Sequence, residues 1–112
     1  MENLSKIEKC KQLPRIEKLE DCRAFYKVFF KYKLFDAHYG AKDHKDYRDK
    51  PFDEFSLDEV LTSFTIIQRE DYWNGGYDST FERYLENKTF EKLYNRLQEL
   101  IKEEVLWLKI HL

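Results

Sequence analysis

Apolar residues recur at helical spacing in several separate stretches of the chain, and the clearest stretch is residues 57–72. Its apolar positions follow at i, i+3, i+4, i+7 and i+10, which places them on one helical face: Leu57, Val60, Leu61, Phe64 and Ile67. Ser56 and Glu59 form a capping box in front of them. The Asn-Gly-Gly segment at 74–76 tolerates the positive φ with which helices often end. The pattern therefore predicts one long helix whose two ends are both marked.

Two further helical patterns occupy the N-terminal third. Ser5 and Glu8 form a second capping box, which predicts a short helix over residues 6–12. Pro14 ends that helix and suits the first turn of another, predicted over 14–34. The inward face of the second helix comprises Ile16, Leu19, Cys22, Tyr26, Phe29, Phe30 and Lys33. Phe25 and Tyr32 lie off this face, so we expect the helix to be covered on more than one side.

The C-terminal part predicts two more helices. Ser79 and Glu82 resemble a capping box for a short helix whose inward residues are Phe81, Tyr84 and Leu85. Thr89 is a plausible N-cap for the last helix, whose apolar face holds Phe90, Leu93, Tyr94, Leu97, Leu100, Ile101 and Val105. The tail 105–112 is apolar almost all round. It continues the helix or forms a strand, and we favour the helix because no partner strand is evident.

These patterns define the fold class. We expect residues 1–112 to form a single all-α domain of four to five helices, with a short C-terminal strand as the alternative ending. Residues 36–52 are polar, contain Gly and Pro, and predict a long loop. Aromatic residues are 17% and charged residues 38% of the chain, while Gly and Pro number 3 and 2. This composition excludes a disordered chain and a β-sandwich.

The sequence also bears on location. No stretch is apolar for the roughly 18 residues that a membrane span needs. Residues 1–6 hold no apolar signal core, and Cys10 and Cys22 are the only cysteines. We therefore expect a cytoplasmic protein with two reduced thiols and no membrane association, a Cys10–Cys22 disulfide being the alternative.

The net charge of −2 conceals an uneven distribution. Residues 6–33 hold nine Lys and Arg against four acids, a net of +5. Residues 53–86 hold two Arg against nine acids, a net of −7. Because such fields steer association more than they determine fold, the surface is the best functional clue in the sequence.

The segment 56–97 resembles a bacterial domain-of-unknown-function family, number 6508 in that series. The family pattern is an apolar helix, R-x-E-R-F-x-x-G, a short helix, a turn and a final R-L. Glu70 and Gly75 match it, Tyr72 stands for Phe, and Arg96-Leu97 ends it. The two family arginines are Gln68 and Asp71 here. The family has no established activity, so the resemblance implies no reaction.

The predicted docking site is the helix end and turn around Trp73. Trp is a large anchor with one hydrogen-bond donor, of the kind that dominates interfaces. The residues that we expect to bind a protein partner are Arg69, Glu70, Asp71, Tyr72, Trp73, Tyr77 and Asp78. The alternative is that Tyr72 and Trp73 close the core while the charged residues are merely solvated.

Other chemistries are less well supported by the residues. The acids Glu70, Asp71, Asp78 and Glu82 offer oxygen ligands for Mg²⁺ or Ca²⁺, but no D-x-D-x-D-G loop is present. Ligand types for Zn²⁺ occur in the polar loop, at Asp36, His38, Asp43, His44 and Asp46. We read both sets as solvated residues and expect no metal and no cofactor. No nucleophile motif or phosphate loop occurs, so we expect a protein that is not an enzyme.

The favoured function is a small interaction or regulatory protein with a protein partner. One alternative is a nucleic-acid-associated regulator that uses the basic residues Lys9, Arg15, Arg23, Lys27 and Lys31. Another, by analogy with small acidic proteins of phages and mobile elements, is counter-defence by acidic surface mimicry. The apolar C-terminal segment also suggests a homodimer.

Overall fold

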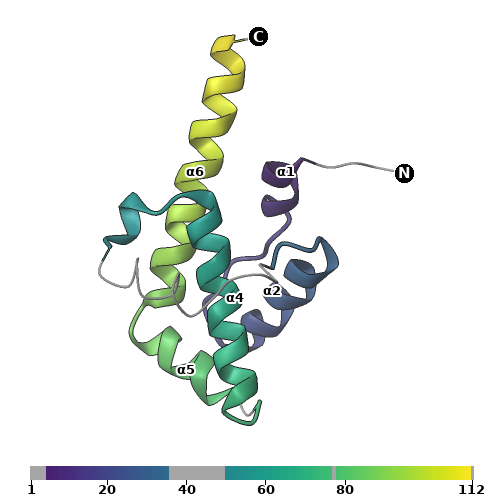
Figure 1. The fold of residues 1–112 in the computed structure, drawn as a ribbon, viewed down its shortest axis with the longest axis vertical. Coiled ribbons are helices and arrows are strands. Elements are labelled where there is room, and N and C mark those ends of the chain that lie inside the picture. The colour runs from purple at the N-terminus through teal and green to yellow at the C-terminus, as the bar shows by residue number, and fades with distance from the viewer. Residues whose placement is uncertain (1–4, 36–49, 77, 112) are drawn as a thin grey trace.

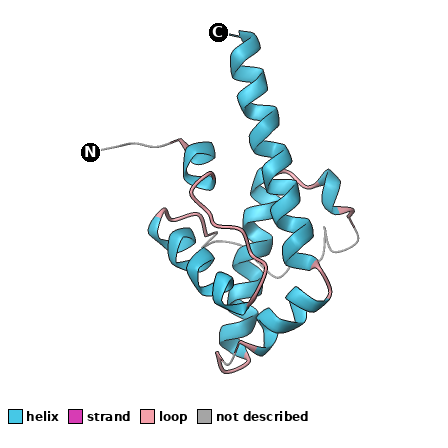
Figure 2. Cartoon of the chain, turned by 180° about the vertical axis from the view of Figure 1, so that it is seen from behind, coloured by secondary structure: helices cyan, strands magenta, loops and turns pink. Residues whose placement is uncertain are grey.

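The computed structural model describes residues 5–35, 50–76 and 78–111. Among these residues the regular secondary structure is helical, with loops between the helices, which confirms the all-α prediction (Figure 1, Figure 2). The helices are α1 (Lys6–Cys10), α2 (Leu19–Lys31), η1 (Phe52–Glu54, a 3₁₀ turn), α4 (Leu57–Trp73), α5 (Ser79–Glu86) and α6 (Thr89–His111). Because α6 runs on to His111, the tail is helical and the strand alternative is wrong.

The core is built largely from phenylalanine rings. α4 packs against α5 and α6, and α2 packs against α5. The rings of Phe25 and Phe64 meet with their centroids 4.6 Å apart, and Phe90 stacks on the other side of Phe64 at 6.3 Å. The Tyr26 hydroxyl donates a 2.7 Å hydrogen bond to the backbone carbonyl of Phe64, which joins α2 to α4 inside the core. Aromatic residues therefore fill the positions that Leu and Val usually occupy.

The start of α2 differs from the prediction. The helix begins at Leu19 and not at Pro14, because the Asp21 carboxylate accepts hydrogen bonds from the backbone N–H groups of Glu17 and Lys18. Lys18, three residues before Asp21, is therefore the N-cap of α2. The predicted face is also shifted: Phe25 is fully buried, whereas Phe30 is 42% exposed.

Capping chemistry explains where the other helices begin. The capping box of Ser56 and Glu59 is present with both of its bonds, as predicted. The short helix predicted from Ser79 and Glu82 begins at Ser79, directly after Asp78, which is in a left-handed conformation. Thr89 is likewise the first residue of α6, and its N–H donates to the side chain of Asn87.

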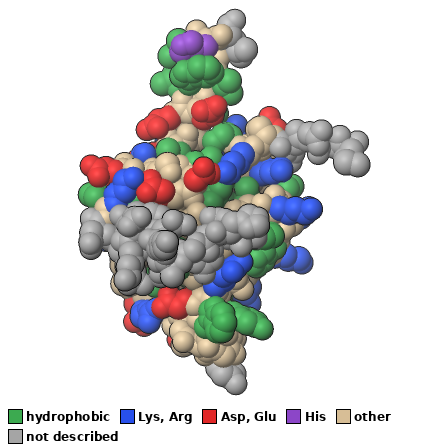
Figure 3. Space-filling view, viewed as in Figure 1, with side chains coloured by type: hydrophobic (Ala, Val, Ile, Leu, Met, Phe, Trp, Pro, Cys, Tyr) green, Lys and Arg blue, Asp and Glu red, His purple; other side chains and the backbone are tan. Residues whose placement is uncertain are grey.

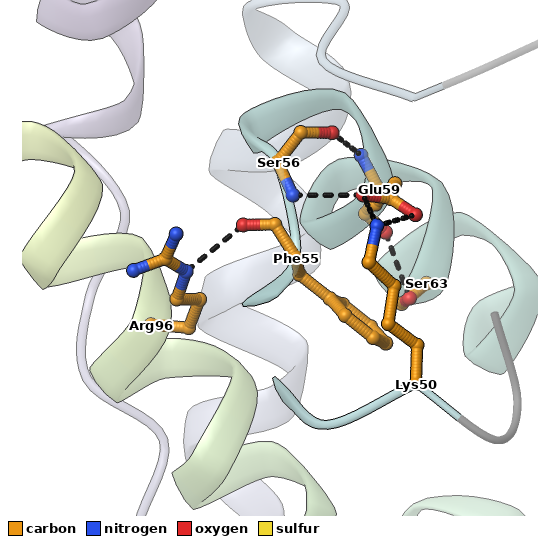
Figure 4. Close-up of polar contacts among 6 residues, drawn as sticks. All are labelled: Lys50, Phe55, Ser56, Glu59, Ser63 and Arg96. Atoms are coloured by element: carbon orange, nitrogen blue, oxygen red, sulfur yellow. Dashed lines mark hydrogen bonds and ion pairs between the residues drawn. The ribbon is translucent and has the colours of Figure 1, made fainter. Parts of the chain in front are cut away.

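A polar junction fixes α6 against the start of α4 (Figure 4). Arg96 Nε donates a 2.9 Å hydrogen bond to the carbonyl of Phe55, directly before the capping box. Lys50 Nζ contacts both oxygens of Glu59 at 2.8 and 3.0 Å. Most of the predicted loop, 36–49, lies outside the described residues. At its end, Phe52 is the first residue of η1 and not a loop residue.

Only the first half of α6 belongs to the core. Its buried residues are Phe90, Leu93, Leu97 and Ile101. Beyond them, the helix projects from the body of the molecule (Figure 1). Large apolar side chains are exposed on this projecting end, namely Leu106, Trp107, Leu108 and Ile110.

Candidate interaction site

Two aromatic side chains stand in solvent on the last turn of α4. Tyr72 is 72% exposed and Trp73 is 80% exposed. Their rings meet edge to face with centroids 6.5 Å apart. The alternative reading, in which these two residues close the core, is therefore wrong. An exposed Trp beside a Tyr offers a large apolar area together with two polar tips.

The turn after α4 holds this aromatic pair in place. Gly75 and Gly76 adopt φ values of 97° and 71°. The N–H of Gly75 donates to the carbonyl of Tyr72, and that of Gly76 donates to the carbonyl of Asp71. These bonds form a Schellman motif, which satisfies the last carbonyls of the helix. The Asn-Gly-Gly segment had predicted this end of α4. Tyr77 of the predicted site lies outside the described residues.

Glu70 connects α4 to α5. Its carboxylate accepts hydrogen bonds from the Arg83 guanidinium at 2.5 Å and from the Tyr84 hydroxyl at 2.7 Å. Burial, and then the bond to Glu70, raise the pKa of Tyr84, so this hydroxyl keeps its proton and remains a donor. Glu70 therefore joins the last part of α4, which carries Trp73, to α5.

Asp71 points inward, contrary to its predicted place on a docking surface. It is 6% exposed, and its Oδ1 atom has no hydrogen-bond partner among the described residues. Burial raises its pKa, and the negative charge of Asp78 raises it further. Backbone N–H groups of Thr80 and Asp78 act in the opposite direction. Asp71 thus faces the start of α5 and is not available to a partner.

The remaining charges of the site are less free than the sequence implied. Arg69 is half-buried, and Asp78 contacts the Arg23 guanidinium of α2. Ion pairs also join acids of the 53–86 segment to cations, namely Lys6–Asp58, Lys50–Glu59 and Arg83–Glu70. The fold therefore cancels part of the charge asymmetry, which leaves fewer carboxylates for the predicted acidic mimicry.

The structure spreads the predicted nucleic-acid residues over three segments. Lys9 lies on α1, while Arg15 lies in the connection after it, bonded to Glu17 and 5.8 Å from the ring centre of Tyr94. Arg23, Lys27 and Lys31 follow at intervals of four residues on α2, and all three are exposed. Only these last three form a continuous basic stripe.

The described residues offer neither a metal-ligand cluster nor a reactive thiol. Within residues 5–35, 50–76 and 78–111, no group of three or more His, Cys, Asp and Glu could hold a metal ion. His38 and His44 lie outside these ranges, as do the acids of their set. Cys10 and Cys22 are free, as predicted, and buried. Burial raises the pKa of the Cys10 thiol to about 11 and that of Cys22 to about 12, so neither is poised as a nucleophile.

Comparison with known proteins gives no relative for this chain. No protein-family model, curated protein or solved structure matches it. The resemblance of residues 56–97 to family 6508 therefore stays a prediction. In the part of the chain that the structure describes, no helix is long and apolar enough to cross a membrane.

Proposed function

We propose that this protein is a non-enzymatic interaction protein that docks a protein partner through Tyr72 and Trp73. The observation that carries the proposal is the exposure of both rings at a helix end that is held by the backbone bonds of Gly75 and Gly76 and by the contacts of Glu70 with α5. Interface energy concentrates in such aromatic anchors when a partner pocket desolvates them. The buried thiols of Cys10 and Cys22 fit a reducing, cytosolic setting.

The charges on α5, beside the two aromatic side chains, indicate which partner surface would fit this site. Glu82 and Glu86 of the neighbouring α5 are exposed and carry no ion pair among the described residues. A partner surface with an apolar pocket for Tyr72 and Trp73, and with Lys or Arg at the edge of that pocket, would therefore complement this part of the molecule. Charges at the rim of an interface affect the association rate more than the affinity, so the aromatic pair should supply most of the affinity.

Affinity purification from the native host tests this proposal, with variants of the two tryptophans. Trp73→Ala removes the proposed anchor, whereas Trp107→Ala removes an exposed Trp at the far end of the molecule. Since both side chains are exposed, each variant should change the free energy of unfolding by about 0.5 kcal/mol or less. We expect one set of bound proteins to be lost with Trp73→Ala and kept with Trp107→Ala. Equal recovery with both variants would contradict the proposal.

We also propose that the projecting end of α6 associates with a second copy of the chain. The support is the exposed apolar set Leu106, Trp107, Leu108 and Ile110, since large exposed apolar patches mark interaction surfaces. Sedimentation equilibrium over roughly 10 to 300 µM covers the weak affinities expected of a short helix. The wild type should dimerise, and a variant with Leu106→Gln and Ile110→Gln should remain monomeric.

The basic stripe of α2 supports a second candidate function, binding of single-stranded nucleic acid. Arg23, Lys27 and Lys31 are spaced about 6 Å apart along the helix, from the rise of about 1.5 Å per residue. A mobility shift at low salt tests it, with Lys27→Gln and Lys31→Gln combined as the weakened variant. No shift at tens of micromolar protein would end this candidate.

A further inference from the structure

A hollow of about 500 Å³ lies where α1, the end of α2 and α4 meet. Tyr32, Leu34 and Leu61 supply apolar wall, and Leu34 and Leu61 are themselves buried. Lys6, Lys9 and Lys33 line the same hollow, and Lys6 and Lys33 are exposed. The space therefore has a mostly polar lining, with cationic side chains that reach toward solvent, and a smaller apolar area. Its volume falls within the range of about 300–1,000 Å³ that is usual for small-molecule sites.

The described residues that line the hollow carry a net positive charge, since the charged ones are three lysines and Asp58, which contacts Lys6 Nζ. Lys9 and Lys33 carry no ion pair with any residue in the described ranges. Lys and Arg side chains gather on the side of the molecule that α1 and α2 form (Figure 3). An anion that entered here would meet two ammonium groups that no described acid pairs with, next to the side chains of Leu34 and Leu61.

The backbone conformation of Lys33 is a second feature of the hollow. Lys33 has φ of 54°, in the left-handed region that favours glycine. The N–H of Lys33 donates to the carbonyl of Phe30, and the N–H of Leu34 donates to that of Phe29, so a Schellman motif holds this conformation. A side chain here costs about 1 kcal/mol relative to glycine. This helix ending places Lys33 where its side chain lines the hollow.

We propose that the hollow binds a small organic anion, with an aromatic or aliphatic body and one carboxylate, phosphate or sulfonate group. The body packs against Leu34, Leu61 and the Tyr32 ring. The anionic group lies between the ammonium groups of Lys9 and Lys33. This site is separate from Tyr72 and Trp73 at the end of α4, so a negative result for one proposal does not affect the other.

The probe for the test is 1-anilinonaphthalene-8-sulfonate, an aromatic sulfonate of suitable size, titrated by fluorescence into the native protein. We expect one site whose Kd rises about fivefold to tenfold in Lys9→Gln combined with Lys33→Gln, which corresponds to about 1–1.4 kcal/mol. Lys11→Gln, at an exposed lysine directly after α1 that does not line the hollow, is the control and should leave the Kd unchanged. Circular dichroism and thermal melting establish that all variants are folded.

Two results would overturn the proposal. One is a Kd that is the same in the double variant and in the Lys11→Gln control, which would place the probe elsewhere, for instance on the end of α6. The other is the absence of saturable binding up to about 1 mM. A salt series adds a second readout, since binding that depends on the two lysines weakens as the salt concentration rises.

Discussion

The guanidinium of Arg23 on α2 binds the carboxylate of Asp78, the residue that precedes α5. The Asp78 side chain is largely covered, while that of Arg23 is largely exposed. The hydrogen bond from Arg23 to Asp78 raises the pKa of the guanidinium. The contact joins the basic N-terminal region to the acidic middle region, which the sequence alone presents as separate surfaces.

A double-mutant cycle with Arg23→Gln and Asp78→Asn should give a small, favourable coupling between the two residues. Exposed ion pairs contribute little and are sensitive to salt. The coupling should vanish near 1 M salt, where the Debye length is about 3 Å. Urea unfolding of the four proteins at two salt concentrations measures it. A coupling that is unchanged by salt would mean that the pair acts through packing.

Lys33→Gly should stabilise the protein by about 0.5–1 kcal/mol, because glycine adopts the left-handed conformation without steric cost. Lys31→Gly, two residues earlier within α2, is the matched control and should destabilise by about 1 kcal/mol. Chemical denaturation checks both values. The same Lys33→Gly variant should bind the anilinonaphthalene sulfonate less tightly, so stability and binding should change in opposite directions. Destabilisation by both glycines would refute the strain at Lys33.

Asp71→Asn should make stability less dependent on pH. Burial raises the pKa of Asp71 above its ordinary 3.8, so the folded protein holds this proton more tightly than the unfolded chain does. The contribution is full below the unfolded pKa and is lost as the pH rises through the folded pKa. The variant should therefore gain on the wild type as the pH rises from about 3.8 through the folded pKa. Asp53→Asn, at an exposed carboxylate, is the control and should show no such gain.

Both thiols should react slowly with Ellman's reagent in the native protein. Relative to an ordinary thiol of pKa 9.0, pKa values of about 11 and about 12 reduce the thiolate fraction of Cys10 and Cys22. The reductions are about 100-fold and about 1,000-fold near neutral pH, since only the thiolate attacks. Denaturant should release both at the rate of a free thiol. Rapid labelling of either cysteine in the native state would contradict their burial.

The fold could largely be predicted because its signals are local. The capping box of Ser56 and Glu59, the Gly75-Gly76 ending and the spacing of apolar residues each depend on neighbours within a few positions. The errors arose where a local cue had a competitor. Pro14 suits a helix start, but the carboxylate of Asp21 caps the chain at Lys18 instead. Thr89 likewise suits an N-cap, but α6 already begins at Thr89, whose N–H donates to the Asn87 side chain.

The site was predictable only in part, because exposure is a tertiary property. Sequence pattern placed Tyr72 and Trp73 at a helix end but left open whether they face solvent or core. It treated Asp71 as a surface acid, although the chain folds it beneath α5. Lys9 and Lys33 are 24 positions apart by residue number, so no spacing rule connects them to one hollow. The fold alone brings them together.

Site-specific photo-crosslinking from position 73 tests the central claim most directly. A benzophenone amino acid replaces Trp73 in one variant and Lys27 in a control, and each protein is irradiated in an extract of the native host. We expect a discrete crosslinked protein from position 73 that is absent from position 27 and is competed by unlabelled wild type but not by Trp73→Ala. No crosslink from position 73, or the same products from both positions, would contradict it.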